Sequence, residues 1–339
     1  MKYVFGVASP LVFAIVKHLI EIDKLTKDDC ILLLMRGYKI PERYLAEYSN
    51  VITNLSDVIC EPSGRVFQGV RVWKTNHYVK AFDRLVDEYI GNDTFFWYSQ
   101  VCNNDICSLM VTKQNCVGYY ILEDGIGSYK PYNPQTFIGW RYWMYKWILL
   151  PLWPRIFAVK NHFIETEHPK FKACIGISSR AFPLHQESLR VVGVPFETID
   201  IGYQPDAIIS IDPLFLSLSD EQTVFIYQKL GEYVQTKQYK TIAYKYHPYF
   251  MSTLYQQHKK RYQQLIDMYI GTHAIAIDPT ESLENILMTY RSDFYTGNSS
   301  IAIYAHEMGV TCYSYLHLLQ RFSNDYSNLP LLEDICVFI

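Results

Sequence analysis

Apolar runs alternate along the chain with segments whose apolar residues recur at helical spacing. Residues 2–7 form a short apolar run, the chain breaks at residues 6–10, and residues 11–22 then show helical spacing. Residues 30–35 are a second continuous apolar run, which is typical of a parallel strand buried on both faces. The chain therefore begins as a strand, a turn, a helix and a strand.

Two more helix–strand pairs follow before residue 125, and a further strand is expected at residues 171–178. The pattern predicts helices around residues 79–90 and 105–112, with strands at 94–98 and 117–122. Alternation of this kind predicts an open, mostly parallel sheet with helices on both faces. Ligands of such sheets gather where the strands end.

The second half of the chain repeats the alternation. We predict five strands and four helices there: strands at 207–211, 241–246, 274–277, 293–296 and 310–315, and helices at 220–235, 253–269, 282–290 and 300–308. Residues 191–205 are rich in Gly and Pro and predict a linker. Because a single core rarely exceeds roughly 250–300 residues, a chain of 339 residues should form two domains, 1–195 and 200–339.

Composition narrows the class of protein. The net charge of −3, from 31 basic and 34 acidic residues, gives no polycationic footprint and argues against a nucleic-acid binder. The eight cysteines include no Cys-x-x-Cys pair and predict buried reduced thiols. The chain starts directly in a strand pattern without signal-peptide features, so we expect a cytoplasmic protein. The 29 tyrosines suit stacking on sugars or bases, and the alternative explanation is a Tyr-rich, AT-biased genome.

Residues 137–155 differ from the rest of the chain. Four of the six tryptophans lie there, interleaved with cations and apolar residues: Trp140, Trp143, Trp147 and Trp153. The cations and two prolines interrupt the run, so it cannot be a spanning helix of about 20 apolar residues. Trp mixed with Arg and Lys suits the lipid headgroup layer, which predicts peripheral contact with the cytoplasmic face of an inner membrane through residues 140–153. A buried aromatic cluster or a dimer contact fits this composition equally well.

Two acids and a glycine follow the predicted strand at 117–122. Glu123-Asp124-Gly125 would place a carboxylate where α/β sheets bind ligands, and the glycine lets the backbone turn sharply. Such a carboxylate could take the proton from an acceptor hydroxyl as a general base. Taken alone, the motif is more typical of a solvated turn.

His247-Pro248 follows the predicted strand at 241–246, which contains Lys245. Proline restricts the residue before it, so His247 should be held in an extended conformation at the strand end. A cation and an imidazole there can contact a phosphate, and the imidazole can donate a proton as the phosphate leaves. The alternative is a structural histidine in a turn.

Two further strand ends precede helices. Gly297-Asn298-Ser299-Ser300 offers backbone amides and two hydroxyls that could bind an anion without the help of a metal ion. A single serine at such a position is more typically a helix cap. Glu281, in Pro279-Thr280-Glu281, could accept hydrogen bonds from ribose hydroxyls. Alternatively, it could simply be an acidic residue that the helix dipole favours in the first turn.

The set of motifs resembles the bacterial sialyltransferases of the lipooligosaccharide and polysialic acid type. Those enzymes carry an acidic-acidic-Gly motif in the N-terminal domain, and His-Pro and Ser-Ser motifs in the C-terminal domain. The opening Val7-Ala8-Ser9-Pro10-Leu11 also looks like the Ser/Thr-Pro-Leu turn after their first strand. The resemblance covers most of the chain as short separated motifs, and no Asp-x-Asp motif is present. It implies an α/β protein of GT-B fold, with two Rossmann-like domains facing each other across a cleft.

The resemblance also implies roles. Glu123 would be the general base, with Asp124 as its neighbour or substitute, and Ser9 and Gly125 would lie on the acceptor side. His247 would contact the donor phosphate and act as general acid. The remaining donor-binding positions would be Lys245, Pro248, Glu281, Asn298, Ser299 and Ser300. The N-terminal domain, including residues 137–155, would serve the acceptor and the C-terminal domain the CMP-sugar.

The implied reaction is an inverting, metal-independent transfer of a nonulosonic acid (sialic, legionaminic or pseudaminic acid) from its CMP-activated form. The acceptor would be an oligosaccharide or a lipid-linked glycan of lipopolysaccharide or capsule, and no cofactor is expected. The alternatives are a related GT-B transferase that uses CMP-Kdo or CDP-glycerol, and a catalytically silent GT-B scaffold for glycan assembly.

Overall fold

In a computed structural model the chain forms two compact units, Met1–Pro195 and Phe196–Ile339. The structure describes residues 1–35, 38–53, 75–100, 105–130, 168–247, 250, 255–279, 281–326 and 330–339. The Trp-rich segment 137–155 and Pro248 lie outside the described residues, so the predictions made for them stay predictions.

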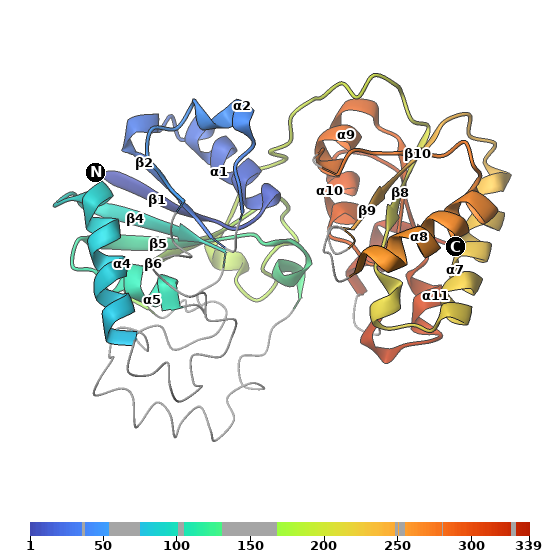
Figure 1. The fold of residues 1–339 in the computed structure, drawn as a ribbon. Coiled ribbons are helices and arrows are strands. Elements are labelled where there is room, and N and C mark those ends of the chain that lie inside the picture. Colours follow the sequence, from blue (N-terminus) through green and yellow to red (C-terminus); the bar gives the residue numbers. More distant parts are fainter. Residues whose placement is uncertain are drawn as a thin grey trace. The chain divides into compact units, whose positions relative to one another are not determined.

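The first unit is built on a parallel sheet with strand order β3-β2-β1-β4-β5-β6-β7 in its described part. The strands are β1 (Lys2–Val7), β2 (Cys30–Leu34), β3 (Val51–Ile52), β4 (Phe95–Ser99), β5 (Cys116–Leu122), β6 (Phe171–Gly176) and β7 (Leu189–Val191). The helices are α1 (Pro10–Ile22), α2 (Glu42–Leu45), α4 (Thr75–Ile90) and α5 (Asp105–Val111). Helices cover both faces, with α1 on one and α4 and α5 on the other (Figure 1).

Local sequence explains these elements. All five residues of β2 are buried, as the continuous apolar run predicts for a strand covered on both faces. Ser9 caps α1, because its Oγ accepts a hydrogen bond from the Val12 amide, and Pro10 occupies the first turn, where a missing N–H costs nothing. The helix buries one stripe: Val12, Phe13, Ile15, Val16, Leu19 and Ile20.

The second unit has a parallel sheet with order β10-β9-β8-β11-β12-β13 in its described part. The strands are β8 (Ala207–Ile211), β9 (Ile242–Tyr246), β10 (Ile275–Ala276), β11 (Asp293–Thr296), β12 (Cys312–Ser314) and β13 (Cys336–Phe338). The helices are α7 (Asp220–Thr236), α8 (Gln256–Leu265), α9 (Leu283–Tyr290), α10 (Ile301–Glu307) and α11 (Leu316–Gln320). Figure 1 shows α9 and α10 on one side of this sheet and α7 and α11 on the other.

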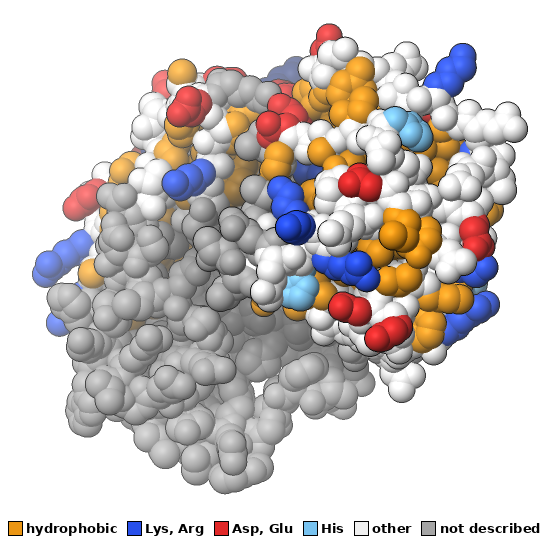
Figure 2. All heavy atoms as spheres, turned by 45° about the vertical axis from the view of Figure 1, so that its right-hand side comes forward, with side chains coloured by type: hydrophobic (Ala, Val, Ile, Leu, Met, Phe, Trp, Pro, Cys, Tyr) orange, Lys and Arg blue, Asp and Glu red, His pale blue; other side chains and the backbone are white. Residues whose placement is uncertain are grey.

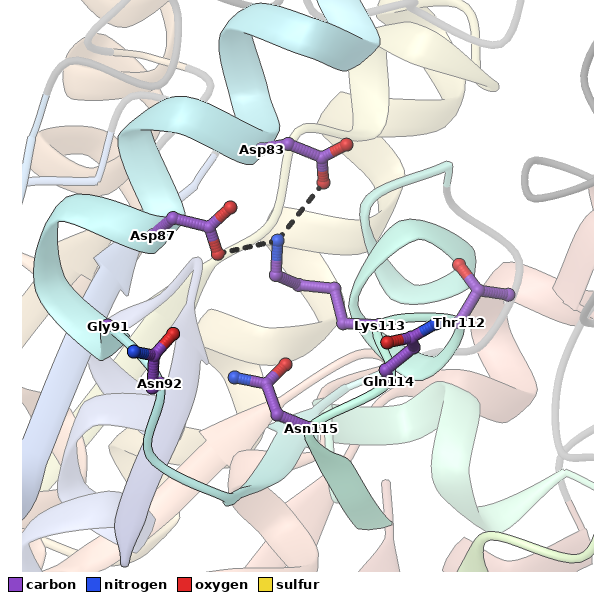
Figure 3. A pocket seen from close by; sticks show the side chains of 8 residues that line it. All are labelled: Asp83, Asp87, Gly91, Asn92, Thr112, Lys113, Gln114 and Asn115. Carbon is purple, nitrogen blue, oxygen red and sulfur yellow. Dashed lines mark hydrogen bonds and ion pairs between the residues drawn. The ribbon is translucent and has the colours of Figure 1, made fainter.

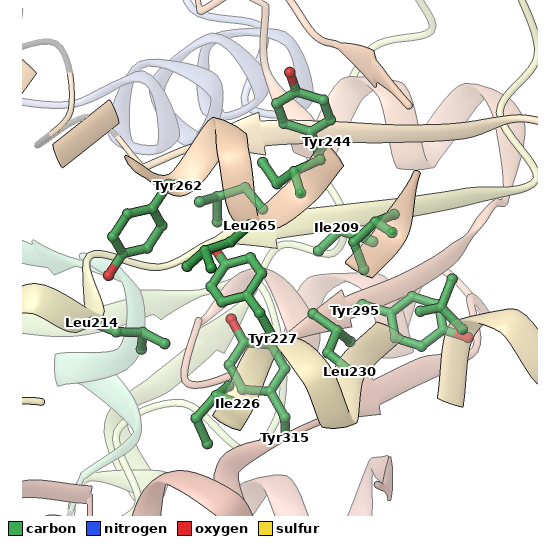
Figure 4. Close-up of a cluster of buried hydrophobic side chains, with 14 of the residues drawn as sticks. Ile209, Leu214, Ile226, Tyr227, Leu230, Tyr244, Tyr262, Leu265, Tyr295 and Tyr315 are labelled. Carbon is green, nitrogen blue, oxygen red and sulfur yellow. The ribbon is translucent and has the colours of Figure 1, made fainter. Parts of the chain in front are cut away.

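Tyrosines fill much of the core between this sheet and the helices α7 and α8 (Figure 4). Their hydroxyls find partners at the margins of the core, since a buried hydroxyl without one is costly. Tyr244 and Tyr246 both donate to Gln263, at 2.7 and 2.9 Å, and Tyr262 accepts from the Phe215 amide at 2.9 Å. Part of the high tyrosine content is therefore core packing and not a surface for stacking on sugars.

The predicted alternation of strands and helices is confirmed in both halves. The short edge strands β3, β7 and β13 and the short helices α2 and α11 were not predicted, because two to five residues give too little periodicity. The predicted helix at 253–269 is α8 followed by one π turn, Ile266–Ile270. No described helix is both long and apolar enough to span a bilayer.

Candidate functional site

The carboxyl ends of four neighbouring strands meet at one edge of the second sheet. Asp212 follows β8, His247 follows β9, Gly297 follows β11 and Tyr315 follows β12. The ladders continue past the strand ends, because the His247 amide donates to Ile211 O at 3.0 Å and the Tyr315 amide to Thr296 O at 3.1 Å. Residues of the predicted His-Pro and Ser-Ser motifs therefore lie at one edge, where α/β sheets bind ligands.

The side chain of Asp212 connects several of these strand ends. Its Oδ2 accepts hydrogen bonds from the Gly297 amide and from the Tyr315 hydroxyl, both at 2.8 Å. Burial raises the pKa of its carboxyl, while these hydrogen bonds, the nearby charge of His247 and the Asn298 amide oppose the rise. The carboxyl thus ties the ends of β8, β11 and β12 together beside the imidazole of β9.

His247 is half-buried next to Asp212. Burial lowers the pKa of its imidazole and the charge of Asp212 works in the opposite direction. A lowered pKa makes the imidazole neutral near pH 7, and an approaching anion would favour its protonation. A neutral imidazole beside a carboxyl can take up a proton and return it, which is the chemistry of a general acid or base.

The segment after β11 presents polar atoms at the same edge. Ser299 Oγ accepts a hydrogen bond from the Ile301 amide at 3.2 Å, and Ser300 begins α10 without a side-chain capping bond. Asn298 Oδ1 and Thr296 Oγ1 are buried and have no hydrogen-bond partner among the described residues. Such buried oxygens are costly, which is typical of a site that a ligand completes.

Lys245 lies two residues before His247, on β9, and feels the charges of the acidic residues around the start of α9. Burial lowers the pKa of the Lys245 ammonium, and the charges of Glu284, Glu281 and Asp278 oppose that shift. Ser282, whose Oγ accepts from the Asn285 amide, caps α9, so Glu281 stands before the cap and not in the first turn. The structure thus places an acidic environment around Lys245, to which Glu281 contributes together with Glu284 and Asp278.

The two acids of the first unit have different environments. Glu123 is fully buried, and its carboxylate accepts hydrogen bonds from the Tyr129 hydroxyl and the Ile177 amide, both at 2.7 Å. These bonds hold the loop after β6 against the short helix Gly125–Tyr129, so Glu123 supports the local structure. Sequence reasoning could not separate the two acids, because their difference lies in burial.

Asp124, in contrast, is half-buried at the carboxyl end of β5, and its amide donates to Ser128 Oγ at 2.9 Å. Gly125 has a φ of +74°, in the left-handed region where glycine is favoured, so it makes the sharp turn that was predicted. Ser9 caps α1 after β1 at the same edge of this sheet. Of the two acids, Asp124 is the one that solvent reaches.

Sequence reasoning missed Asp212 and Tyr315. Asp212-Pro213 follows a buried strand as His247-Pro248 does, and this shared pattern could have drawn attention to it. Tyr315 carried no signal, because its role depends on the position of β12 beside β11.

A separate cavity of about 700 Å³ lies near the amino ends of β4 and β5 (Figure 3). Its central cation, Lys113, is bound by Asp83 at 3.2 Å and Asp87 at 2.8 Å. Both carboxylates come from α4, so the ion pairs fasten this helix to the turn before β5. The cavity lies at the edge opposite to the one where α/β sheets bind ligands, and we assign it a structural role.

Acidic and basic side chains are intermingled on the face shown in Figure 2, without a field of one sign. Within the described ranges, no group of three or more His, Cys, Asp or Glu side chains is arranged to hold a metal ion. Five of the six cysteines that the structure describes are buried, and none of the six forms a disulfide.

Comparison with solved structures identifies the fold. A UDP-N-acetylglucosamine 2-epimerase-like protein of Listeria monocytogenes superposes with a TM-score of 0.54 at 10% identity, covering 93% of this chain and 78% of that one. The UDP-GlcNAc 2-epimerase of Methanocaldococcus jannaschii, in complex with UDP-GlcNAc and UDP, gives 0.53 at 12% identity, covering 100% and 89%. This chain has the GT-B fold. The sequence itself matches no protein-family model and no curated protein.

The GT-B assignment confirms the expected fold class of two parallel-sheet, Rossmann-like units. A third similar structure, S. aureus MnaA with UDP, has a TM-score of 0.51 at 11% identity, covering 93% of this chain and 79% of that one. At such identities the likeness establishes the fold alone.

Gly297 offers a direct test of the edge geometry. A Cβ on this residue would lie 2.6 Å from Asp212 Oδ2 and 2.7 Å from the Tyr315 ring. We expect Gly297→Ala to lower the free energy of unfolding by about 1–3 kcal/mol, the usual cost of overpacking, as measured by chemical denaturation.

Gly127→Ala is the matched control, because nothing lies within 4 Å of a Cβ at Gly127. Its effect on the free energy of unfolding should be small. Equal effects of the two substitutions would contradict the close packing of Gly297 against Asp212.

Proposed function

We propose that the protein is a metal-independent glycosyltransferase that moves a nonulosonic acid from its CMP-activated form to a surface-glycan acceptor. The observation that carries the proposal is the gathering of Asp212, His247 and the Asn298-Ser299-Ser300 segment at one sheet edge of a GT-B fold. Ligands of parallel α/β sheets bind at this edge, and the segment supplies hydroxyls and an amide side chain for a phosphate and a sugar.

On the donor side, the second unit holds the nucleotide. The hydroxyls of Ser299 and Ser300 donate hydrogen bonds to the phosphate, and Glu281 accepts from the ribose. His247, with Asp212 beside it, becomes protonated as the phosphate binds and passes that proton to the phosphate oxygen when the sugar–phosphate bond breaks. Asp212 stabilises the imidazolium by its charge, because it lies next to the ring.

On the acceptor side, the first unit supplies the base. Asp124 takes the proton from the acceptor hydroxyl, whose oxygen attacks the anomeric carbon from the face opposite the leaving CMP. One bond forms to the acceptor, one bond to the phosphate breaks, and the anomeric configuration inverts. Glu123 positions Asp124 by holding the surrounding loops together.

The residue set and the resemblance to sialyltransferases support CMP as the nucleotide, whereas two similar structures contain UDP. UDP is therefore the control nucleotide in any test of the donor. A cytoplasmic enzyme with a lipid-linked acceptor fits this reaction, with residues 140–153 in contact with the membrane.

Nucleotide binding tests the donor. We expect CMP at 100 times its dissociation constant to stabilise the folded protein by about 2.7 kcal/mol, which raises the melting temperature by several degrees. The measurement is a thermal-shift titration with CMP, CDP and UDP. A shift with UDP or CDP and none with CMP would overturn the CMP assignment.

A donor panel tests the reaction itself. The protein would be incubated with CMP-N-acetylneuraminic acid, CMP-Kdo, CDP-glycerol and UDP-N-acetylglucosamine, with and without a galactose-terminated acceptor, and released nucleotide would be measured. Release of CMP that depends on the acceptor supports the proposal. No release from any donor, together with normal nucleotide binding, would favour a catalytically silent scaffold.

A further inference from the structure

The carboxyl edge of the first sheet contains two buried hydrogen-bond donors that the proposed mechanism does not use. Gln100 follows β4 and Arg180 lies in the loop after β6, on either side of Asp124, which follows β5. Neighbouring strands lie about 4.8 Å apart, so the ends of β4 and β6 are separated by roughly 10 Å, within reach of one ligand. The three residues therefore follow three neighbouring strands at the same edge of the sheet.

Neither donor is satisfied by the described protein. Gln100 is only 2% exposed, and its Nε2 has no hydrogen-bond partner among the described residues. Arg180 Nη1 is buried and also has no partner there. A buried charged donor without an acceptor costs more than a neutral one, so its presence needs an explanation.

Arg180 differs in this respect from other cations of the same unit. Arg190 forms a two-pronged ion pair with Asp23, and Lys113 is bound by two carboxylates. Arg180, in contrast, forms no ion pair with any described residue. Its planar guanidinium presents paired N–H donors that match a carboxylate or a phosphate.

The loop that carries Arg180 is held firmly against the motif of Asp124. The Phe182 amide donates to Ser128 O at 2.7 Å, and the Ile177 amide donates to Glu123 at 2.7 Å. Phe182 also has a φ of +50°, an unusual conformation for a bulky residue. The guanidinium is thus carried by a fixed loop and not by a loose surface segment.

We infer that the acceptor carries an anionic group, a carboxylate or a phosphate, that accepts hydrogen bonds from the Arg180 guanidinium and the Gln100 amide while Asp124 faces the reacting hydroxyl. That the bound anion belongs to an acceptor rests on the proposed function. The existence of an anion site at Arg180 does not. It makes Arg180 a specificity-determining residue, which selects sugar acids or phosphorylated glycans over neutral ones.

The first experiment needs no catalysis. Calorimetric titration would measure the binding of N-acetylneuraminic acid and of glucose 6-phosphate to the full chain, with glucose as the neutral control. We expect one of the anions to bind and Arg180→Met to weaken it by about 10- to 100-fold, as for a hydrogen bond to a charged group. Binding of N-acetylneuraminic acid would identify the anionic group as a carboxylate, and binding of glucose 6-phosphate would identify it as a phosphate.

Lys172→Met is the matched control, because it removes an equal charge from the exposed amino half of β6, the strand that precedes the Arg180 loop. It should leave anion binding unchanged. If neither anion binds, or if the two variants weaken binding equally, the inference is wrong.

The second experiment separates this inference from the proposed function. With an acceptor pair that differs only in the anionic group, Arg180→Met should raise KM for the charged acceptor alone and leave CMP affinity unchanged. Equal losses for both acceptors would overturn the anion site while the transferase proposal stands. Arg180-dependent anion binding without any sugar transfer would overturn the transferase proposal while the site stands.

Discussion

Replacing His247 with alanine should lower turnover by about 100- to 10,000-fold, the usual loss when a general acid or base is removed. The fold should persist, because the imidazole is half-buried and the strand is held through the His247 backbone amide. Released nucleotide measures the turnover, and circular dichroism with thermal melting checks the fold.

His273→Ala is the control for this change, since His273 is an exposed histidine of the same unit. Its turnover should match that of the wild-type protein. Unchanged turnover in His247→Ala would remove His247 from the mechanism and would leave the carboxyl edge of the second sheet without its proton donor.

The two adjacent acids of the first unit should respond in opposite ways to the loss of charge. Asp124→Asn should lower turnover by about 100- to 10,000-fold with little change in stability, because this half-buried acid is the proposed base. Glu123→Gln should lower the free energy of unfolding by about 1–3 kcal/mol, because an amide cannot accept both buried hydrogen bonds without turning its NH₂ toward a donor.

Turnover and chemical denaturation of the two variants, measured side by side, check this division. The reverse result, in which Glu123→Gln abolishes turnover in a stable protein and Asp124→Asn is active, would return the role of base to Glu123. Either outcome decides the question that the motif alone left open.

Sequence patterns were sufficient for most of the framework. The buried strands read as continuous apolar runs, and the helix predicted at 220–235 begins with a full capping box, formed by Ser219 and Gln222. Short edge strands such as β13 were not predicted, because partly exposed strands of three residues have no periodicity to detect. Local sequence therefore predicts the long helices and strands but not the short strands at the edges of the sheets.

The site was harder to predict, because its members become neighbours only through strand order. Asp212 lies beside His247 and Gly297 since β8 stands between β9 and β11, and nothing in the local sequence fixes that order. The difference between Glu123 and Asp124 likewise depends on burial created by β6, more than forty residues away in the chain. Chemistry-bearing residues could be named from sequence, but their grouping required the fold.

We expect the donor to bind at the carboxyl edge of the second sheet. Hydrogen exchange of the full chain, with and without a saturating CMP-sugar, measures this directly at each amide. Exchange should slow at residues 297–301 and next to Asp212 and His247. Protection confined to other regions, such as the cavity around Lys113, would contradict it.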